Sequence, residues 1–203
     1  MSNDNAIARV FKLWAKISMM VVDGTRDATS VADVLQGILS PLSAKVLKTW
    51  KTIQLGTGLQ TADDFRKAVK SAGMKIGDWA NDILGKPAFT ATTSETEVEL
   101  VVASVAELGF KDGATRKDIY VRAQELGLDL CPPEVGPQLR LQYTDQPKGE
   151  WLVIAMEPIT DSEGLISLFL VAHDSGGLWL SASNGSPGNV WSGRYRFVFL
   201  RRK

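Results

Sequence analysis

The sequence predicts an α+β protein, in which an N-terminal helical region is followed by helices packed on a small antiparallel sheet. Two changes of pattern lead to this class. Apolar residues recur every three or four positions through much of residues 1–146, as on helices. Alternating and short continuous apolar runs, typical of strands, replace them from residue 150 onward. We expect a helical region over 1–86, a linker or short edge strand over 87–94, and an α+β domain over 95–203.

The helical region opens with an amphipathic segment over residues 5–22, whose apolar stripe is Ile7, Phe11, Trp14, Ile17 and Val21. Further helices are expected over 31–38, from Pro41 to Trp50, over 62–72 and over 76–84. Thr61 and Asp64 have the spacing of a capping box at the start of the helix over 62–72.

Helices are expected across 95–146 and antiparallel strands across 150–203. Ser94 with Glu97 predicts a helix start before "EVELVVASVAELGF", and Thr115 with Asp118 predicts another before "RKDIYVRAQEL". The stretch "LCPPEVGPQLRLQY" permits a short helix near Val135 or a strand, and the helix is favoured. Later, "DSGG" between two apolar runs predicts a hairpin. With a helix at 135–143, the order of elements is that of a winged helix, one form that this domain could take.

Composition indicates a folded core and no strongly charged partner. The 203 residues are 44% hydrophobic and 23% charged, with a net charge of zero. Residues 1–94 hold 12 Lys and Arg against 8 Asp, and residues 95–203 hold 11 against 15 Asp and Glu. No apolar run approaches the roughly 20 residues of a membrane-spanning helix, and no secretory signal is evident. We therefore expect no membrane partner. The single cysteine fits a reducing compartment, so the chain is expected in the cytoplasm.

Three stretches carry a family resemblance: "TADDFRKAVKSAGMKIGDWANDIL", "LGLDLCPPEVGPQLRLQY" and "GEWLVIAMEPI". They resemble a family of uncharacterised bacterial proteins with no known activity, across roughly residues 50–203. The resemblance therefore implies no catalytic residue, cofactor or binding site.

The residues offer little for catalysis. One His and one Cys cannot form a Cys/His metal site, and neither a nucleophile elbow nor a phosphate-binding loop is present. We predict no metal, no cofactor and no catalytic residues. An enzyme that uses Cys131 with His173, or carboxylates such as Glu134 and Glu157, stays an alternative.

DNA binding is a second alternative. In a winged helix, Gln138, Arg140 and Gln142 would lie on the recognition helix, and Arg116 and Lys117 would start the helix before it. The connector "LDLCPP" is long for such a turn, and this half of the chain is acidic overall.

The interpretation we prefer is a non-enzymatic cytoplasmic binding or interaction protein with a protein or small-ligand partner. Its candidate ligand-binding residues are Trp179, Trp191 and Tyr195, which surround "SNGSPGNVWSG" in the last strands. Exposed aromatic rings beside Asn and Ser could stack on a sugar or hold a peptide. The alternative is that Trp179 and Trp191 belong to the core.

Overall fold

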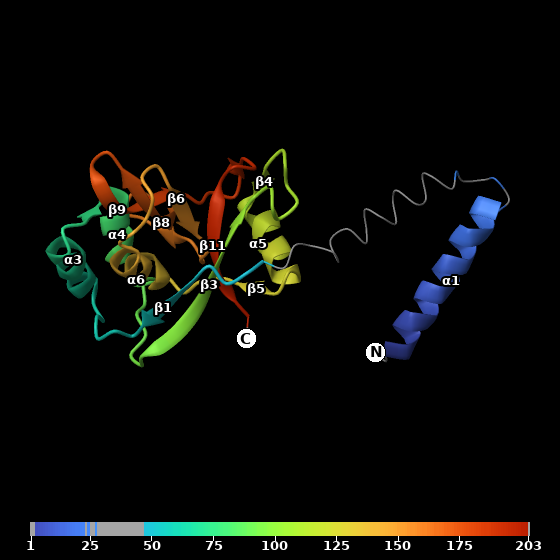
Figure 1. Ribbon diagram of the computed structural model, residues 1–203, viewed down its shortest axis with the longest axis horizontal. Helices are drawn as coiled ribbons and strands as arrows, with labels where there is room; N and C mark the ends of the chain where they lie inside the picture. The colour runs from blue at the N-terminus through green and yellow to red at the C-terminus, as the bar shows by residue number, and fades with distance from the viewer. Residues whose placement is uncertain (1–2, 23, 25–26, 28–46, 203) are drawn as a thin grey trace. The chain divides into compact units, whose positions relative to one another are not determined.

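The computed structural model describes residues 3–22, 24, 27 and 47–202 (Figure 1). The chain divides into two compact units, residues 1–46 and residues 47–203. In the first unit, α1 (Asn3–Val22) confirms the helix expected over 5–22. The helix expected over 31–38 lies outside the described residues, as does the one from Pro41 up to residue 46. The described end of the latter, residues 47–50, is not helical, and the Trp50 N–H donates to the carbonyl of Leu100. None of the described helices is both long and apolar enough to cross a membrane.

The second unit combines helices with many short strands. Its described helices are α3 (Ala62–Ser71), α4 (Asp78–Leu84), α5 (Arg116–Glu125) and α6 (Val135–Gln142). Its described strands are β1 (Lys51–Leu55), β2 (Lys75–Ile76), β3 (Thr96–Ser104), β4 (Ala114–Thr115), β5 (Leu128–Asp129), β6 (Trp151–Ile154), β7 (Ile159–Thr160), β8 (Ile166–Asp174), β9 (Gly177–Asn184), β10 (Val190–Trp191) and β11 (Arg196–Arg201).

A nine-stranded mixed sheet is the main element, in the order β1-β3-β11-β6-β8-β9-β2, with β5 paired to β11 and β7 to β8. Most pairs are antiparallel, but β6 runs parallel to β11, and β2 runs parallel to β9. The prediction of helices on a small antiparallel sheet, with a winged helix as one form, was therefore wrong. The sheet is larger because β1 and β3 come from segments outside the predicted strand region.

Helix α6 lies within the curl of this sheet. It contacts β1 at one end of the strand order and β8 and β9 near the other, so the sheet must bend around it (Figure 1). Gly136 permits the close approach, because a Cβ there would lie 2.7 Å from Cβ of Phe169 on β8. We call the face of the sheet that carries Phe169 the inner face.

The opposite, outer face packs against α5 and the small β4–β10 sheet. Phe197 of β11 pairs with Val153 on this face. The ring of Phe197 lies 5.0 Å from that of Trp191 on β10 and 6.5 Å from that of Tyr120 on α5. The central strands are therefore buried on both faces, and this double burial forms the core.

Burial on both faces explains the error over residues 95–110, where the sequence predicts a helix. Residues 96–104 instead form β3, in which the adjacent Leu100 and Val101 are both fully buried, and a turn follows over 105–109. A strand covered on both sides reads as a continuous apolar run, which spacing alone does not distinguish from a helical stripe. The β-branched Val98, Val101 and Val102 favour the strand.

Other local predictions are confirmed. The "DSGG" segment joins β8 to β9 in a hairpin, with Asp174 opposite Gly177, whose φ is 113°. The stretch after the prolines is helical, as favoured, and forms α6. Thr115 caps α5 by accepting the backbone N–H of Asp118.

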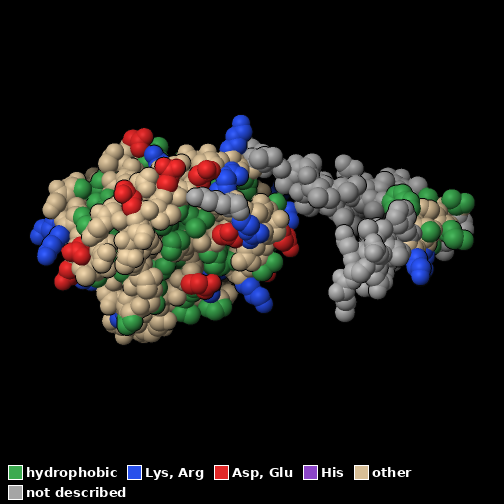
Figure 2. All heavy atoms as spheres, turned by 90° about the horizontal axis from the view of Figure 1, so that it is seen from below, with side chains coloured by type: hydrophobic (Ala, Val, Ile, Leu, Met, Phe, Trp, Pro, Cys, Tyr) green, Lys and Arg blue, Asp and Glu red, His purple; other side chains and the backbone are tan. Residues whose placement is uncertain are grey.

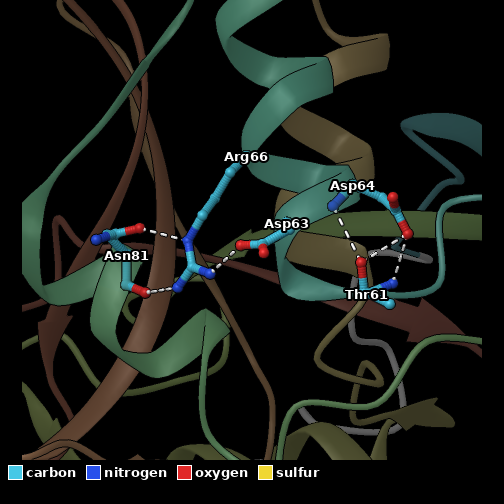
Figure 3. A network of polar contacts seen from close by, with 5 residues as sticks. All are labelled: Thr61, Asp63, Asp64, Arg66 and Asn81. Carbon is cyan, nitrogen blue, oxygen red and sulfur yellow. Dashed lines mark hydrogen bonds and ion pairs between the residues drawn. The ribbon is translucent and has the colours of Figure 1, made fainter.

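The capping box predicted at Thr61 and Asp64 is also present (Figure 3). The carboxylate of Asp64 accepts the Thr61 N–H at 2.9 Å, and the Thr61 hydroxyl accepts the Asp64 N–H. A second set of contacts in Figure 3 links α3 to α4, because Arg66 donates to Oδ1 and to the carbonyl of Asn81. Arg66 also pairs with Asp63 at 2.8 Å. These contacts hold α4 against α3.

Candidate functional site

Two tryptophans flank an alanine on the outer face of the sheet. Trp151 of β6 pairs with Ala172 of β8, and Ala172 pairs with Trp179 of β9. Residues directly opposite each other on paired strands project from the same face, so the three form one row across three strands. We call Trp151, Ala172 and Trp179 the aromatic row.

The row is open to solvent at one end. Trp151 is 53% exposed, Trp179 is partly buried and Ala172 is buried. Adjacent strands are about 4.8 Å apart, so the two tryptophan backbones are separated by about 10 Å. Because only a methyl group stands between them, the two indoles do not compete for one position.

Polar groups fix the Trp179 end of the row. The indole Nε1 donates to Oδ1 of Asp174 at 2.9 Å, and the same oxygen accepts the Gly176 N–H at 2.7 Å. Lys75 of β2 pairs with Trp179, and its Nζ lies 5.0 Å from the ring centroid, a cation–π contact. One edge of the row therefore carries a carboxylate and an ammonium group.

Two hydroxyls continue the same face along β9. Ser181 and Ser183 alternate with Trp179, so all three side chains project from the outer face. Both serines are partly exposed. Neither hydroxyl bonds another residue that the structure describes, so both are available to a ligand.

A buried arginine on α6 holds the backbone of the aromatic row from the inner face of the sheet. Arg140 is fully buried, and its guanidinium donates to the carbonyl of Ala172 at 3.2 Å, to Oε1 of Gln146 and to the carbonyl of Tyr143. Gln146 in turn donates to the carbonyl of Glu150 at 3.1 Å, one residue before Trp151. Burial lowers the pKa of the Arg140 guanidinium to about 10, so the group stays charged at neutral pH. These bonds fix the segment leading into Trp151 against β8.

Of the three predicted ligand-binding residues, only Trp179 belongs to the aromatic row. Trp191 is 1% exposed and packs edge-on against Tyr195 and Phe197, each with ring centroids 5.0 Å away. Trp191 is therefore a core residue, the alternative left open by the sequence. Tyr195 covers it and is 47% exposed.

The residues proposed to read DNA bases are occupied inside the protein. Gln138 is buried and donates to Oε1 of Glu134 and to Thr57. Gln142 bonds both the N–H and the carbonyl of Gln54 on β1, and Arg140 is fully buried. A helix held inside the curl cannot enter a DNA groove. On the face shown in Figure 2, Lys and Arg side chains are interspersed with Asp and Glu.

The other two predicted DNA contacts lie at the start of α5. Arg116 donates to the carbonyl of Gly185 at 3.0 Å and lies over the ring of Tyr120, so its role is to hold a loop. Lys117 is exposed. Nothing in this geometry brings Arg116 and Lys117 together with Gln138 and Gln142 on one surface.

The residues considered for catalysis have separate environments. Cys131 is buried, its Sγ contacts the carbonyl of Val198, and burial raises the pKa of the thiol. Nδ1 of His173 bonds the carbonyl of Gln146 instead. Glu134 is buried and fully hydrogen-bonded, as described below, whereas Glu157 is exposed. Within the described part of the chain, no three His, Cys, Asp or Glu residues gather as metal ligands.

Trp151, Lys75 and Asp174 were missed by the sequence reasoning. Trp151 opens the apolar run "EWLVIAMEP", where it was taken only as part of a strand. The pairing of β6 with β8, and of β8 with β9, brings it into line with Trp179. In the sequence, the only available signal was a large aromatic residue at the start of a predicted strand.

Comparison of the chain with protein-family models, curated proteins and solved structures finds no match. The site must therefore be interpreted from its own geometry.

Proposed function

We propose that the chain is a non-enzymatic binding protein that holds a carbohydrate on the aromatic row. The observation that carries this proposal is the in-register placement of Trp151 and Trp179 on either side of Ala172, with Trp151 half exposed. A large indole left half in water on a regular strand presents an apolar face that a ligand can cover.

Carbohydrate chemistry matches the groups around the row. A pyranose ring has an apolar face of C–H groups, which can lie on the indole of Trp151, and a rim of hydroxyls. Asp174 accepts hydrogen bonds, while Lys75 donates them. The free hydroxyls of Ser181 and Ser183 can do both and lie on the same face. An apolar surface and polar partners for a sugar thus lie side by side.

A polyanionic ligand is less compatible with this site. Lys75 is the cation at the Trp179 end, and Asp174 lies close enough to bond the Trp179 indole. Nucleic-acid binding draws most of its affinity from several cations that neutralise phosphates. A carboxylate within the site opposes that contribution.

The test is a glycan array probed with the labelled full-length chain, followed by titration calorimetry with the glycan that binds best. We expect Trp151→Ala to abolish the array signal, because it removes the exposed stacking surface. Trp79→Ala is the matched control, since Trp79 is 56% exposed but lies on α4 and not in the aromatic row. Circular dichroism should show both variants folded.

Two results would overturn the proposal. One is an array on which no glycan binds, and the other is binding that Trp151→Ala leaves unchanged. A cytoplasmic location is part of the same proposal and rests on the single, buried thiol of Cys131. Fractionation of cells that express the tagged chain would check it.

A further inference from the structure

A second surface lies away from the aromatic row, between α4 and the ends of β8 and β9. Two large apolar residues are exposed there, Trp79 at 56% and Leu165 at 49%. They line a hollow of about 90 Å³ together with Ile166, Ser167 and Asn184. Isolated exposed apolar residues are common, but two that share one hollow form a candidate contact surface.

The hollow is too small for a typical small-molecule ligand. Such pockets usually measure about 300–1,000 Å³, and even benzene occupies a cavity of about 150 Å³. A volume of about 90 Å³ suits one aliphatic side chain. An anchor residue of another polypeptide is an occupant of that size.

The elements around the hollow are acidic. Helix α4, which carries Trp79, contributes Asp78 and Asp82, and the loop that carries Leu165 contributes Asp161 and Glu163. Asp78 and Glu163 are exposed.

The basic side chains that reach α4 are already paired. Lys86 lies 3.2 Å from Asp82, and Arg66 lies 2.8 Å from Asp63. Asp78, next to Trp79, and Glu163, two residues before Leu165, therefore place exposed negative charge close in sequence to the two apolar residues of the hollow.

Asp161 adds to this negative field from within the loop. It is 7% exposed, and its Oδ1 accepts the N–H groups of Glu163 and Leu165, which fixes Leu165 at the edge of the hollow. Its Oδ2 is buried and has no hydrogen-bond partner among the described residues. No described cation pairs with Asp161, so its charge adds to the negative potential of the loop.

We propose that this hollow binds a segment of another protein that carries one large aliphatic side chain flanked by Lys or Arg. The aliphatic side chain enters between Trp79 and Leu165. The flanking cations lie against Asp78 and Glu163. This site is independent of the aromatic row, so either proposal can fail alone.

The experiment selects peptides from a phage-displayed random library on the immobilised full-length chain, with prior depletion on the Leu165→Ala variant. We expect the surviving peptides to share an aliphatic residue next to Lys or Arg. Fluorescence anisotropy with one synthetic peptide should show binding weakened at least about tenfold by Trp79→Ala, the size of a hot-spot loss. Glu163→Lys and raised salt should also weaken binding, because both reduce the attraction between charges.

Val121→Ala is the control and should leave peptide affinity unchanged, because Val121 is exposed but lies on α5. The proposal fails if no peptide survives depletion, if the selected peptides are acidic, or if Trp79→Ala binds them as the unchanged chain does. Sedimentation velocity gives a further outcome that overturns it. If the chain self-associates and Leu165→Ala makes it monomeric, the occupant is a second copy of this chain.

Discussion

The backbone N–H of Gly56 donates to Oε1 of Glu134 at 2.9 Å, which joins the turn after β1 to the start of α6. Oε2 of the same carboxylate accepts the N–H of Thr92 at 2.7 Å, and Gln138 donates to Oε1 at 3.0 Å. The carboxylate is fully buried and has three donors around it. One side chain thus ties α6 to two loops distant in sequence, and this holds the helix inside the curl.

Glu134→Gln should destabilise the protein although it preserves size. Both carboxylate oxygens accept hydrogen bonds from N–H groups, so the amide nitrogen of glutamine must face a donor and leave it unsatisfied. The expected loss is about 2–3 kcal/mol in the free energy of unfolding, measured by urea denaturation. Glu157→Gln, at an exposed acid, should change it by less than about 0.5 kcal/mol. Equal effects from the two variants would contradict the role assigned to Glu134.

Gly136→Ala tests the closest approach between α6 and the sheet. The added methyl group would lie 2.7 Å from Cβ of Phe169, so helix and strand must separate. Overpacking of this kind costs about 1–3 kcal/mol, visible as a lower midpoint of urea unfolding. Gly188→Ala is the control, because nothing lies within 4 Å of a Cβ there, and its midpoint should change little.

Most local patterns predicted local structure, but the Ser94–Glu97 spacing, taken as a helix start, stands at the beginning of strand β3. The Thr61–Asp64 capping box, the hairpin after Asp174 and the helix after the prolines depend on neighbouring residues, and all three are present. The large sheet was not predicted, because pairing between β1 and β3, and of β3 with β11, leaves no trace in short-range spacing. Helix α6 was predicted correctly, but two of its polar residues are buried and are not available to a partner. Gln138 and Arg140 look available to DNA in the sequence, yet they bond groups inside the protein.

Prediction of the candidate site was limited in the same way, because the site depends on pairing between distant strands. Trp179 was identified as a candidate because it is an aromatic residue beside a hairpin. Trp191 was grouped with it on the same ground, although it packs against Phe197 in the core. Trp151 was not grouped with either, because only the register of three strands places it opposite Ala172 and in line with Trp179. Which aromatic residues share a surface depends on strand order, a long-range property.

Trp191→Ala separates a core role from a ligand-binding role. Trp191 is among the largest fully buried side chains, and its removal should cost about 3–5 kcal/mol in the free energy of unfolding. Tyr195→Ala should cost much less, because that ring is 47% exposed. Chemical denaturation of both variants provides the measurement. A Trp191→Ala protein with unchanged stability would show that the indole does not support the core.

The ionised carboxyl of Asp82 should raise the free energy of unfolding, and acid should remove this stabilisation. The Ser162 backbone N–H, followed by the Ser162 hydroxyl and then Lys86, lowers the pKa of the Asp82 carboxyl below its ordinary value. Because its pKa is lower in the folded than in the unfolded chain, the stabilisation is fully present above the ordinary value, near 4. It is lost as the pH falls through the folded-state pKa. Asp82→Asn should therefore make the free energy of unfolding less dependent on pH below about 4, measured by urea denaturation at a series of pH values. Ser162→Ala keeps the backbone donor and should reduce that dependence by less. A reduction as large as that of Asp82→Asn would show that the hydroxyl is the principal cause.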